Sequence, residues 1–342
     1  MAERLLEVKG LKVRFATEDG TVHAVDGVDF ELDRGKVLGI VGESGSGKSV
    51  TAMTLLGLTR DKNTRFEGEV DYKGQNLLDL PESQLRDVRG NQIAMIFQDP
   101  MTSMNPVYTV GDQIVEAITT HEPTGKKEAK RRAIELLRQV GIPNPQSRVD
   151  DYPHQFSGGM RQRAMIAMAL SCNPDILIAD EPTTALDVTI QAQILELLDR
   201  LRADFDSAVI LITHDLGVVA EVADEILVMY AGRIVERGSK RNVFYDPQHP
   251  YTWGLLGSIP RLDRPKPKKL HSIEGTPPSL INLPQGCKFR PRCPHAFEKC
   301  FEEPELKNRV DDKGHLDRCW LTVDEKRGLR DSTIAGEERV VA

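Results

Sequence analysis

The chain has 342 residues, which is more than one domain core usually needs, so we expect a large domain with a smaller appendage. Its formal net charge of -7 gives no positive field for a polyanion, and nucleic acid is therefore not expected as a main partner. No run approaches the roughly 20 apolar residues that a bilayer span needs, and the N-terminus lacks an apolar signal core. These features predict a cytosolic chain that does not cross a membrane by itself.

The first elements in chain order are strands. Residues 5–15 and 23–32 alternate between apolar and polar side chains, which predicts two edge strands of an antiparallel sheet joined by a turn at 18–20. Residues 37–41 form a short apolar strand that leads into a glycine-rich loop, and residues 48–58 read as a helix. This is the strand, loop and helix order of a phosphate-binding motif.

Residues 42–49 match the phosphate-loop pattern G-x-x-x-x-G-K-S/T in full. The glycines let backbone N–H groups converge on phosphate, and the following helix adds its positive N-terminal end. We expect Lys48 to neutralise the β- and γ-phosphates and Ser49 to offer its hydroxyl to Mg²⁺. A glycine-rich turn that binds nothing is the alternative, and the strand-to-helix context disfavours it.

A mostly helical insert follows the next apolar strand, residues 93–97. Gln98 ends that strand, where its amide could contact the metal or the attacking water. Residues 110–140 have a helical pattern that stops at Gly141. Residues 156–160 then read Phe-Ser-Gly-Gly-Met at the start of another helix, which predicts a second anion site. A single domain cannot bring this site onto its own nucleotide, so a sandwich of two subunits is expected.

An acidic pair stands at the end of the apolar strand 176–179. We expect Asp180 to hold Mg²⁺, through water, and Glu181 to polarise the attacking water. The alternative is a helix-capping acidic pair. Residues 189–201 read as a helix and 209–213 as the next strand, which together predict a βαβ unit of a parallel sheet. His214 follows this strand, where it could donate a hydrogen bond to the γ-phosphate and orient Glu181.

Prolines become frequent beyond residue 241, which indicates a semi-rigid linker leading to a small module. The end of the chain is polar and is expected to be disordered. The predicted divisions are a nucleotide-binding domain at 1–245 with a helical subdomain at about 99–165, a linker at 246–285, a cysteine-rich module at 286–322, and a tail at 323–342.

The order of these motifs resembles that of the ATP-binding-cassette (ABC) ATPases, from Leu5 to about Arg241. The resemblance implies an α/β fold: a P-loop NTPase cassette with a mostly parallel core sheet, an antiparallel β subdomain, a helical subdomain and a small cysteine-rich C-terminal module. It also implies a dimer in which Ser157 and Gly159 of one subunit contact the γ-phosphate held by the other.

By the same resemblance Gln98 is the Q-loop residue, Ala185-Leu186-Asp187 the D-loop and His214 the switch histidine. Phe15 is the expected aromatic partner of adenine, although burial in the first sheet is an alternative for it. The catalytic residues are then Glu181, His214 and Gln98, and the Mg²⁺ ligands Ser49, Gln98 and Asp180. The expected nucleotide-binding residues are Phe15, Gly42, Ser44, Gly45, Ser46, Gly47, Lys48, Ser49, Ser157, Gly158, Gly159, Asp180 and Asp187.

Three segments narrow the resemblance to the ATP-binding subunits of oligopeptide and dipeptide importers: residues 156–163, 249–260 and 287–294. The commonest family signature has glutamine where this chain has Met160, and methionine cannot make the same amide hydrogen bonds. The likeness implies ATP and Mg²⁺, a second cassette in a heterodimer with a homodimer as the alternative, two transmembrane permease subunits, an extracytoplasmic binding protein, and a peripheral position on the cytoplasmic face of the membrane. Sugar or nickel are alternative cargoes.

A soluble cassette ATPase acting on DNA or ribosomes is the alternative function. Chromosome-type relatives insert long coiled coils between the phosphate loop and the signature, but residues 50–156 leave no room for them. Translation-type relatives usually duplicate the cassette within one chain, and no repeat is present here. Both observations disfavour the alternative.

Four of the five cysteines crowd the last part of the chain, with the spacing C-x5-C-x6-C-x18-C. In a reducing cytosol such a group favours metal ligation over disulfides, and the C-x2-C pair of zinc ribbons is missing. Some members of the resembled subgroup are thought to carry a four-iron cluster here, so a 4Fe-4S cluster is expected, with zinc or free thiols as alternatives. Arg290 and Arg292 would suit a negatively charged cluster. The expected ligands are Cys287, Cys293, Cys300 and Cys319.

Overall fold

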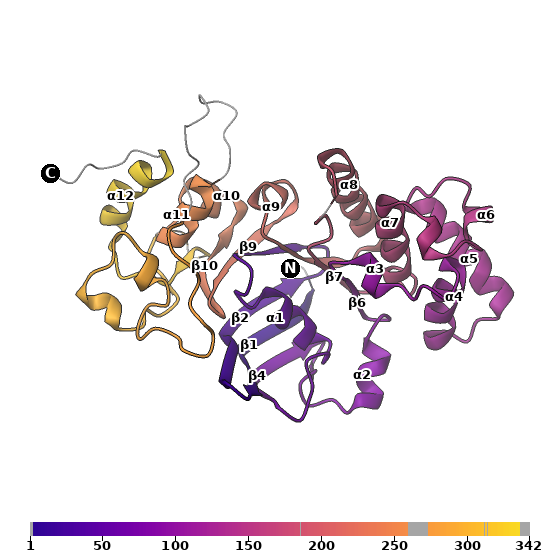
Figure 1. The fold of residues 1–342 in the computed structure, drawn as a ribbon, viewed down its shortest axis with the longest axis horizontal. Helices are drawn as coiled ribbons and strands as arrows, with labels where there is room; N and C mark the ends of the chain where they lie inside the picture. Colours follow the sequence, from indigo (N-terminus) through magenta and orange to yellow (C-terminus); the bar gives the residue numbers. More distant parts are fainter. Residues whose placement is uncertain (1–2, 185, 259–272, 311, 313, 336–342) are drawn as a thin grey trace.

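The fold was analysed in a computed structural model, which describes residues 3–184, 186–258, 273–310, 312 and 314–335. The molecule is elongated: two sheets lie in the middle, a group of helices forms one end and the C-terminal part of the chain forms the other (Figure 1). Among the described residues, no helix combines the length and the apolar character that a bilayer crossing requires.

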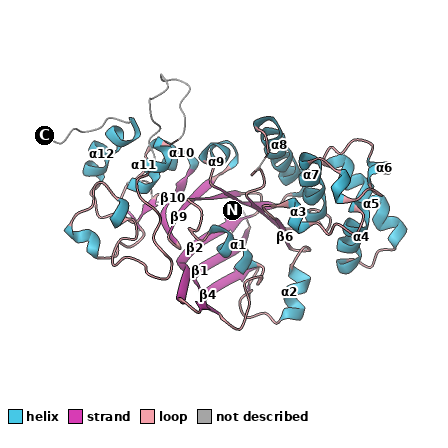
Figure 2. Cartoon of the chain, in the orientation of Figure 1, coloured by secondary structure: helices cyan, strands magenta, loops and turns pink. Residues whose placement is uncertain are grey.

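The N-terminal sheet is antiparallel, with strand order β2-β1-β4-β5. Figure 2 shows β2, β1 and β4 side by side. Because β1 pairs with β2 on one side and with β4 on the other, the expectation that the first two strands are both edges is wrong for β1. The alternating pattern of β1 does not reveal this pairing, because its partner β4 lies about 50 residues further along the chain. The strands are β1 (Arg4–Thr17), β2 (Gly20–Asp33), β4 (Thr64–Tyr72) and β5 (Gln75–Asn76).

The core sheet contains five parallel strands in the order β9-β3-β8-β7-β6, which confirms the predicted parallel βαβ arrangement. Alternate side chains of its strands face opposite layers: Leu38 and Ile40 pack toward the antiparallel sheet, whereas Val37 and Val41 pack toward the helical side. These strands are β3 (Val37–Val41), β6 (Ile93–Ile96), β7 (Ile176–Asp180), β8 (Ala208–Thr213) and β9 (Glu225–Tyr230).

Among the described residues, three helices connect strands β3, β7 and β8 of the core sheet to the strand that follows each in sequence, and most of the segment between β6 and β7 is helical. The predicted helical segment 110–140 is two helices, α4 and α5, that are separated by a break containing Pro123. The connecting helices are α1 (Lys48–Leu55), α8 (Val188–Phe205) and α9 (Leu216–Val222). The others are α2 (Glu82–Val88), α3 (Pro100–Ser103), α4 (Val110–His121), α5 (Lys126–Gln139), α6 (Pro145–Arg148), a 3-10 turn (Pro153–Gln155) and α7 (Gly158–Ala169).

The C-terminal part continues the core sheet. Strand β10 pairs antiparallel with β9, β12 pairs with β10, and β11 pairs with β12. The cysteine-rich module is therefore joined to the cassette by backbone hydrogen bonds. Its elements are β10 (Arg233–Ser239), α10 (Lys240–Tyr245), α11 (Pro250–Gly257), 3-10 turns at Arg290–Arg292 and Glu298–Phe301, β11 (Lys307–Asn308), β12 (Leu316–Asp317) and α12 (Val323–Ala335).

Two expectations about this region need correction. The proposed linker contains α11, whose Tyr251 and Trp253 are fully buried, and Pro250 is compatible with this helix because it occupies the first turn. The polar tail begins with α12 and is not disordered over that helix, since Lys326 is buried and donates a 2.8 Å hydrogen bond to Asp317. The rest of the linker, 259–272, and the end of the tail, 336–342, lie outside the described residues.

Candidate nucleotide site

The phosphate loop connects β3 to α1 and requires glycine at two positions. Gly42 has φ 152°, and a Cβ there would lie 2.2 Å from the carbonyl oxygen of Met229. Gly47 has φ 100°, and a Cβ there would lie 2.4 Å from the carbonyl oxygen of Ala24. Any larger residue would clash with backbone and would need an unfavourable conformation. The glycines thus let the loop fit closely between β2 and β9.

Lys48 is buried at the base of the loop. Its Nζ donates hydrogen bonds to the carbonyl oxygens of Gly42, at 2.8 Å, and Glu43, at 3.0 Å. Burial lowers the pKa of Lys48, although the nearby carboxylates of Glu181, Asp180 and Glu43 act in the opposite direction. The buried hydroxyl of Ser46 has no hydrogen-bond partner. An anionic ligand in the loop would supply a partner for both groups, so this geometry fits a phosphate.

Ser49 and Asp180 meet across the sheet. The Ser49 hydroxyl donates a 3.0 Å hydrogen bond to the Asp180 carboxylate at the end of β7. Burial raises the pKa of Asp180; the Ser49 hydrogen bond and Lys48 oppose the shift, while the Glu181 charge adds to it. A bound cation would stabilise the charged carboxylate. Both side chains offer the hard oxygen donors that Mg²⁺ prefers, so they fit the expected metal.

Glu181 is oriented by groups from three parts of the chain. The Gln98 amide and the Thr184 hydroxyl each donate a 2.9 Å hydrogen bond to its carboxylate, and Nδ1 of His214 lies 3.3 Å from it. The structure therefore brings together the three predicted catalytic side chains. Thr184 was missed by the sequence reasoning, although its place three residues after Glu181 was a signal for such a contact.

Glu181 also has an unusual backbone conformation. Its φ of 48° lies in the left-handed region, which costs a residue with a Cβ about 1–2 kcal/mol. Its N–H donates a 2.8 Å hydrogen bond to the carbonyl oxygen of Ile212, which holds the residue against β8. Strain of this kind persists where the surrounding structure imposes it, and it is concentrated at functional sites.

The Ser-Gly-Gly turn lies at the N-terminus of α7. The Ser157 side chain accepts a 3.3 Å hydrogen bond from the Met160 N–H, and Phe156 is buried in the core beneath the turn. A Cβ at Gly158 would have no neighbour within 4 Å, whereas one at Gly159 would lie 3.2 Å from the Ile190 side chain of α8. Among the described residues, no hydrogen bond joins this turn to the phosphate loop of the same chain. Methionine in place of the family's usual glutamine at position 160 does not remove this hydrogen bond, because its donor is the backbone N–H of Met160.

Asp187 and Phe15, which were predicted to contact the nucleotide, both make contacts within the fold. Asp187 caps α8 by accepting a 3.0 Å hydrogen bond from the Ile190 N–H, and its neighbour Ala185 lies outside the described residues. Phe15 is partly buried in β1 and packs against the core between the two sheets. Their roles at the nucleotide therefore stay predictions.

The four clustered cysteines line one small cavity in the C-terminal module. All are free thiols, and burial raises the pKa to about 11 for Cys287 and to about 12 for both Cys293 and Cys319. Within the described ranges, no group of three or more histidine, cysteine or acidic side chains is arranged to hold a metal ion. The structure gathers the predicted ligands, but it contains no preformed metal centre.

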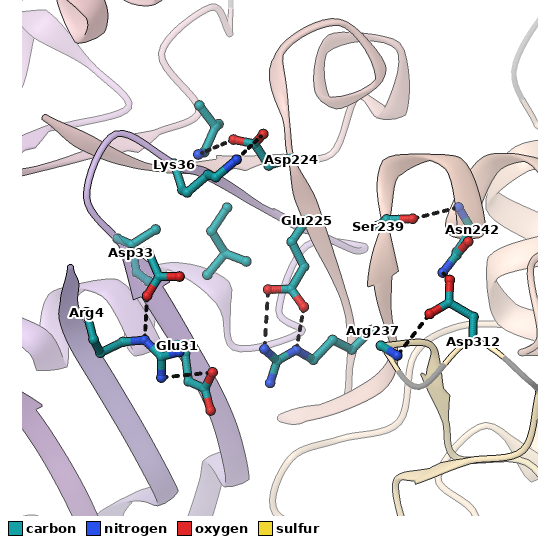
Figure 3. Close-up of a pocket in the computed structure, with 14 residues that line it drawn as sticks. Arg4, Glu31, Asp33, Lys36, Asp224, Glu225, Arg237, Ser239, Asn242 and Asp312 are labelled. Atoms are coloured by element: carbon teal, nitrogen blue, oxygen red, sulfur yellow. Dashed lines mark hydrogen bonds and ion pairs between the residues drawn. The ribbon is translucent and has the colours of Figure 1, made fainter. Parts of the chain in front are cut away.

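A larger cavity of about 300 Å³ lies elsewhere, where β2, β9 and β10 meet (Figure 3). Each cationic side chain of the lining is paired with a carboxylate. Arg4 bonds Asp33, Lys36 bonds Asp224, and Arg237 bonds Glu225. The lining carries five carboxylates, those of Glu31, Asp33, Asp224, Glu225 and Asp312, against three cations, so its excess charge is negative and disfavours an anionic ligand.

The fold and this site define an ABC ATPase, and the comparisons with known proteins agree. The sequence model of the family described as "ABC transporter" matches residues 25–184. Two solved structures have a similar fold. The ATP-binding cassette MJ0796, in a dimeric state bound to ADP and Pi, has a TM-score of 0.62 and 27% identity, covering 69% of this chain and 99% of that one. The cbiO1 protein of Clostridium perfringens has a TM-score of 0.60 and 27% identity, covering 71% and 92%.

Curated relatives match nearly the whole chain. Oligopeptide transport ATP-binding protein OppD of Salmonella typhimurium is 53% identical over 95% of this chain and 96% of its own. Dipeptide transport ATP-binding protein DppD of Bacillus subtilis is 53% identical over 93% and 95%. The family model described as "Oligopeptide/dipeptide transporter, C-terminal region" matches residues 235–300. The chain therefore belongs to the ABC transporter family, in its oligopeptide and dipeptide transporter branch, and it is an ATPase.

Proposed function

We propose that this chain is one of two ATP-hydrolysing subunits of an importer of dipeptides or oligopeptides. The observation that carries the proposal is the convergence of Gln98, Thr184 and His214 on Glu181, next to a complete phosphate loop. The likeness to relatives named for oligopeptide and dipeptide transport, over more than nine tenths of the chain, supports the cargo class.

The Ser-Gly-Gly turn supports a two-subunit ATP site. Its exposed helix N-terminus is an anion site, and it makes no hydrogen bond to the described phosphate loop of its own chain. In our proposal the turn contacts the γ-phosphate held by a second, similar cassette. ATP then closes the two cassettes through hydrogen bonds from both subunits to the phosphate, and hydrolysis removes these bonds and lets the cassettes separate.

A groove beside Gln98 supports contact with a permease at the cytoplasmic face of the membrane. The groove has a volume of about 240 Å³ and lies between α1 and the helical subdomain, with a mostly apolar lining that includes Leu58, Phe97 and Met168. Phe97 precedes the Gln98 that bonds Glu181. A short cytoplasmic segment of a permease seated here would therefore adjoin the catalytic carboxylate, and movement of the cassettes would be passed to the membrane subunits.

We propose in addition that the four clustered cysteines bind a 4Fe-4S cluster. The supporting observation is that all four line the same cavity. Burial raises the pKa of Cys287, Cys293 and Cys319, so these three thiols are neutral until a metal binds and draws off their protons. Such a cluster would serve to hold together a module with little regular secondary structure. Protein purified without oxygen is expected to be brown and to contain iron and labile sulfide. Colourless protein that contains only zinc would contradict the cluster and favour the alternative metal.

Reconstitution with the partner subunits tests the transport proposal. The chain would be purified with the second cassette and the two permeases that the proposal requires, placed in lipid vesicles, and supplied with a peptide-binding protein. Peptide-loaded binding protein should stimulate ATP hydrolysis and move labelled peptide across the bilayer. Stimulation by a sugar or nickel, with no response to di- or oligopeptides, would overturn the cargo class.

A further inference from the structure

Glu43, the second residue of the phosphate loop, is held by an ion pair from the C-terminal module. Arg292 donates two hydrogen bonds to its carboxylate, of 2.6 and 3.0 Å, one to each oxygen. The Arg292 side chain is only 5% exposed and that of Glu43 is 29% exposed. A paired arginine fork of this kind fixes both the position and the orientation of a carboxylate.

The backbone of Glu43 is fixed from the same direction. Its N–H donates a 2.8 Å hydrogen bond to the hydroxyl oxygen of Tyr251 on α11. Tyr251 is fully buried, and its ring packs against Tyr230 and Phe289 with ring centroids 4.7 and 5.4 Å apart. The carbonyl oxygen of the same Glu43 accepts from Lys48. The side chain, the N–H and the carbonyl oxygen of Glu43 thus all make hydrogen bonds.

Arg292 is itself held in place by the cysteine-rich segment. It ends the 3-10 turn at Arg290–Arg292, directly before Cys293, and its N–H donates a 2.9 Å hydrogen bond to the carbonyl of Phe289. Its guanidinium also donates to the carbonyl oxygens of Ile273 and Glu274. Arginine in this setting is a rigid part of the module and not a mobile surface charge.

The ion pair has an electrostatic consequence for the nucleotide. A loop that must hold several phosphate charges carries a carboxylate at its second position, and that charge would repel the ligand if it were uncompensated. Arg292 compensates it. Removing the arginine would leave a partly buried, unpaired carboxylate at the phosphate site and would also release the loop from the module.

We propose that Arg292 is a positioning residue for nucleotide binding, which holds the phosphate loop and neutralises Glu43 so that the loop accepts ATP. The C-terminal module is then part of the nucleotide-binding apparatus of this chain. Arg292 acts through Glu43 and takes no part in the chemical step.

The test is a double-mutant cycle in the full-length chain. In Arg292→Gln, the dissociation constant of a fluorescent ATP analogue should rise about tenfold, because one unscreened charge near the phosphates is worth roughly that factor. Glu43→Gln alone removes the carboxylate charge and keeps the Arg292 charge beside the phosphates, so it should bind ATP at least as tightly as the wild type, and adding it to Arg292→Gln should restore most of the lost affinity. Steady-state hydrolysis by Arg292→Gln should show a raised KM with kcat little changed.

Two comparisons separate this role from simple stabilisation. Lys288→Gln removes a positive charge from the same module, where it pairs with Glu303 and not with the loop, and should leave ATP affinity unchanged. Arg292→Lys, which keeps the charge but not the fork, should lose only part of the affinity and serves as the decisive variant if Arg292→Gln does not fold. Unchanged ATP affinity in the Arg292 variants, or no recovery in the double variant, would overturn the proposal.

Discussion

The side-chain amide of Gln98 donates a 2.9 Å hydrogen bond to the carboxylate of Glu181, so the ends of β6 and β7 are joined at the carboxylate that we propose as the catalytic base. Gln98 precedes the helical subdomain and follows Phe97, which lines the apolar groove that we propose as the permease contact. A displacement of that subdomain would therefore change the orientation of Glu181, which gives a direct physical route from the groove to the hydrolytic site.

Glu181→Gln should retain ATP binding and lose hydrolysis. The amide keeps the shape of the side chain but cannot accept a proton from water, and loss of a general base lowers turnover by about 10²–10⁴-fold. Steady-state phosphate release and the affinity for an ATP analogue measure the two effects. Glu196→Gln, on the exposed face of α8, is the matched control. Normal turnover in the Glu181 variant would show that another residue assists the water.

Thr184→Val should lower turnover more mildly. Valine keeps the volume of threonine but removes the 2.9 Å hydrogen bond that orients Glu181. A bond of this kind contributes about 1 kcal/mol, so kcat should fall roughly fivefold with little change in ATP affinity. Thr184→Ser, which keeps the hydroxyl, should stay close to the wild type. Equal losses in the serine and valine variants would mean that the methyl group, and not the hydrogen bond, matters.

Asp180→Asn should raise the Mg²⁺ concentration needed for hydrolysis. The substitution removes the negative charge beside the Ser49 hydroxyl but keeps an oxygen that could accept its hydrogen bond. Weakening a carboxylate ligand should shift the Mg²⁺ dependence at least about tenfold, because hard cations favour charged oxygen donors. Titration of activity with Mg²⁺ at saturating ATP measures this shift. An unshifted curve would place the metal ligand elsewhere.

Asp175→Asn should change the stability of the protein in acid. Burial alone would raise the pKa of Asp175, but hydrogen bonds from Lys73, Tyr72 and Arg34 hold this pKa below its usual value. A carboxylate with a depressed pKa stabilises the fold above its unfolded value of about 3.9, and the contribution is lost as pH falls through the lower folded value. The variant should lose about 1–3 kcal/mol at pH 7.

Thermal unfolding between pH 3 and pH 7 checks this prediction. The wild type should lose stability below about pH 4 more steeply than Asp175→Asn does, because only the wild type must protonate this carboxylate. Asp204→Asn, an exposed substitution on α8, is the control and should follow the wild type. Parallel curves for Asp175→Asn and the wild type would contradict the role assigned to Asp175.

Local patterns were sufficient to predict the phosphate loop and most of the residues that meet around it. Each such residue follows an apolar strand, and parallel strands deliver their C-terminal ends to one edge of a sheet. This is why Gln98, Asp180 and His214 could be placed near the loop from sequence alone. The backbone strain at Glu181 could not be predicted, since it depends on the hydrogen bond to β8.

Contacts between distant segments were not predictable in the same way. Arg292 and Glu43 are 249 positions apart, and the arginine could equally have been a partner for a metal cluster. The tail looked disordered because α12 is polar, but Lys326 is buried with Asp317 of β12, a pairing that only the fold creates. In both cases the sequence suggests a charged side chain exposed to solvent, whereas in the fold that side chain is buried and paired with a carboxylate of another segment.

The pairing of β12 with β10 also bears on solubility. Without the C-terminal module, the seven-residue β10 would present unpaired backbone groups along its outer side, and an open strand of that kind recruits strands from other molecules. With the module in place, the sheet terminates in β11, only two residues long and bearing Lys307. Truncated forms of this ATPase would consequently be prone to self-association through strand addition, whereas the intact chain is protected from it.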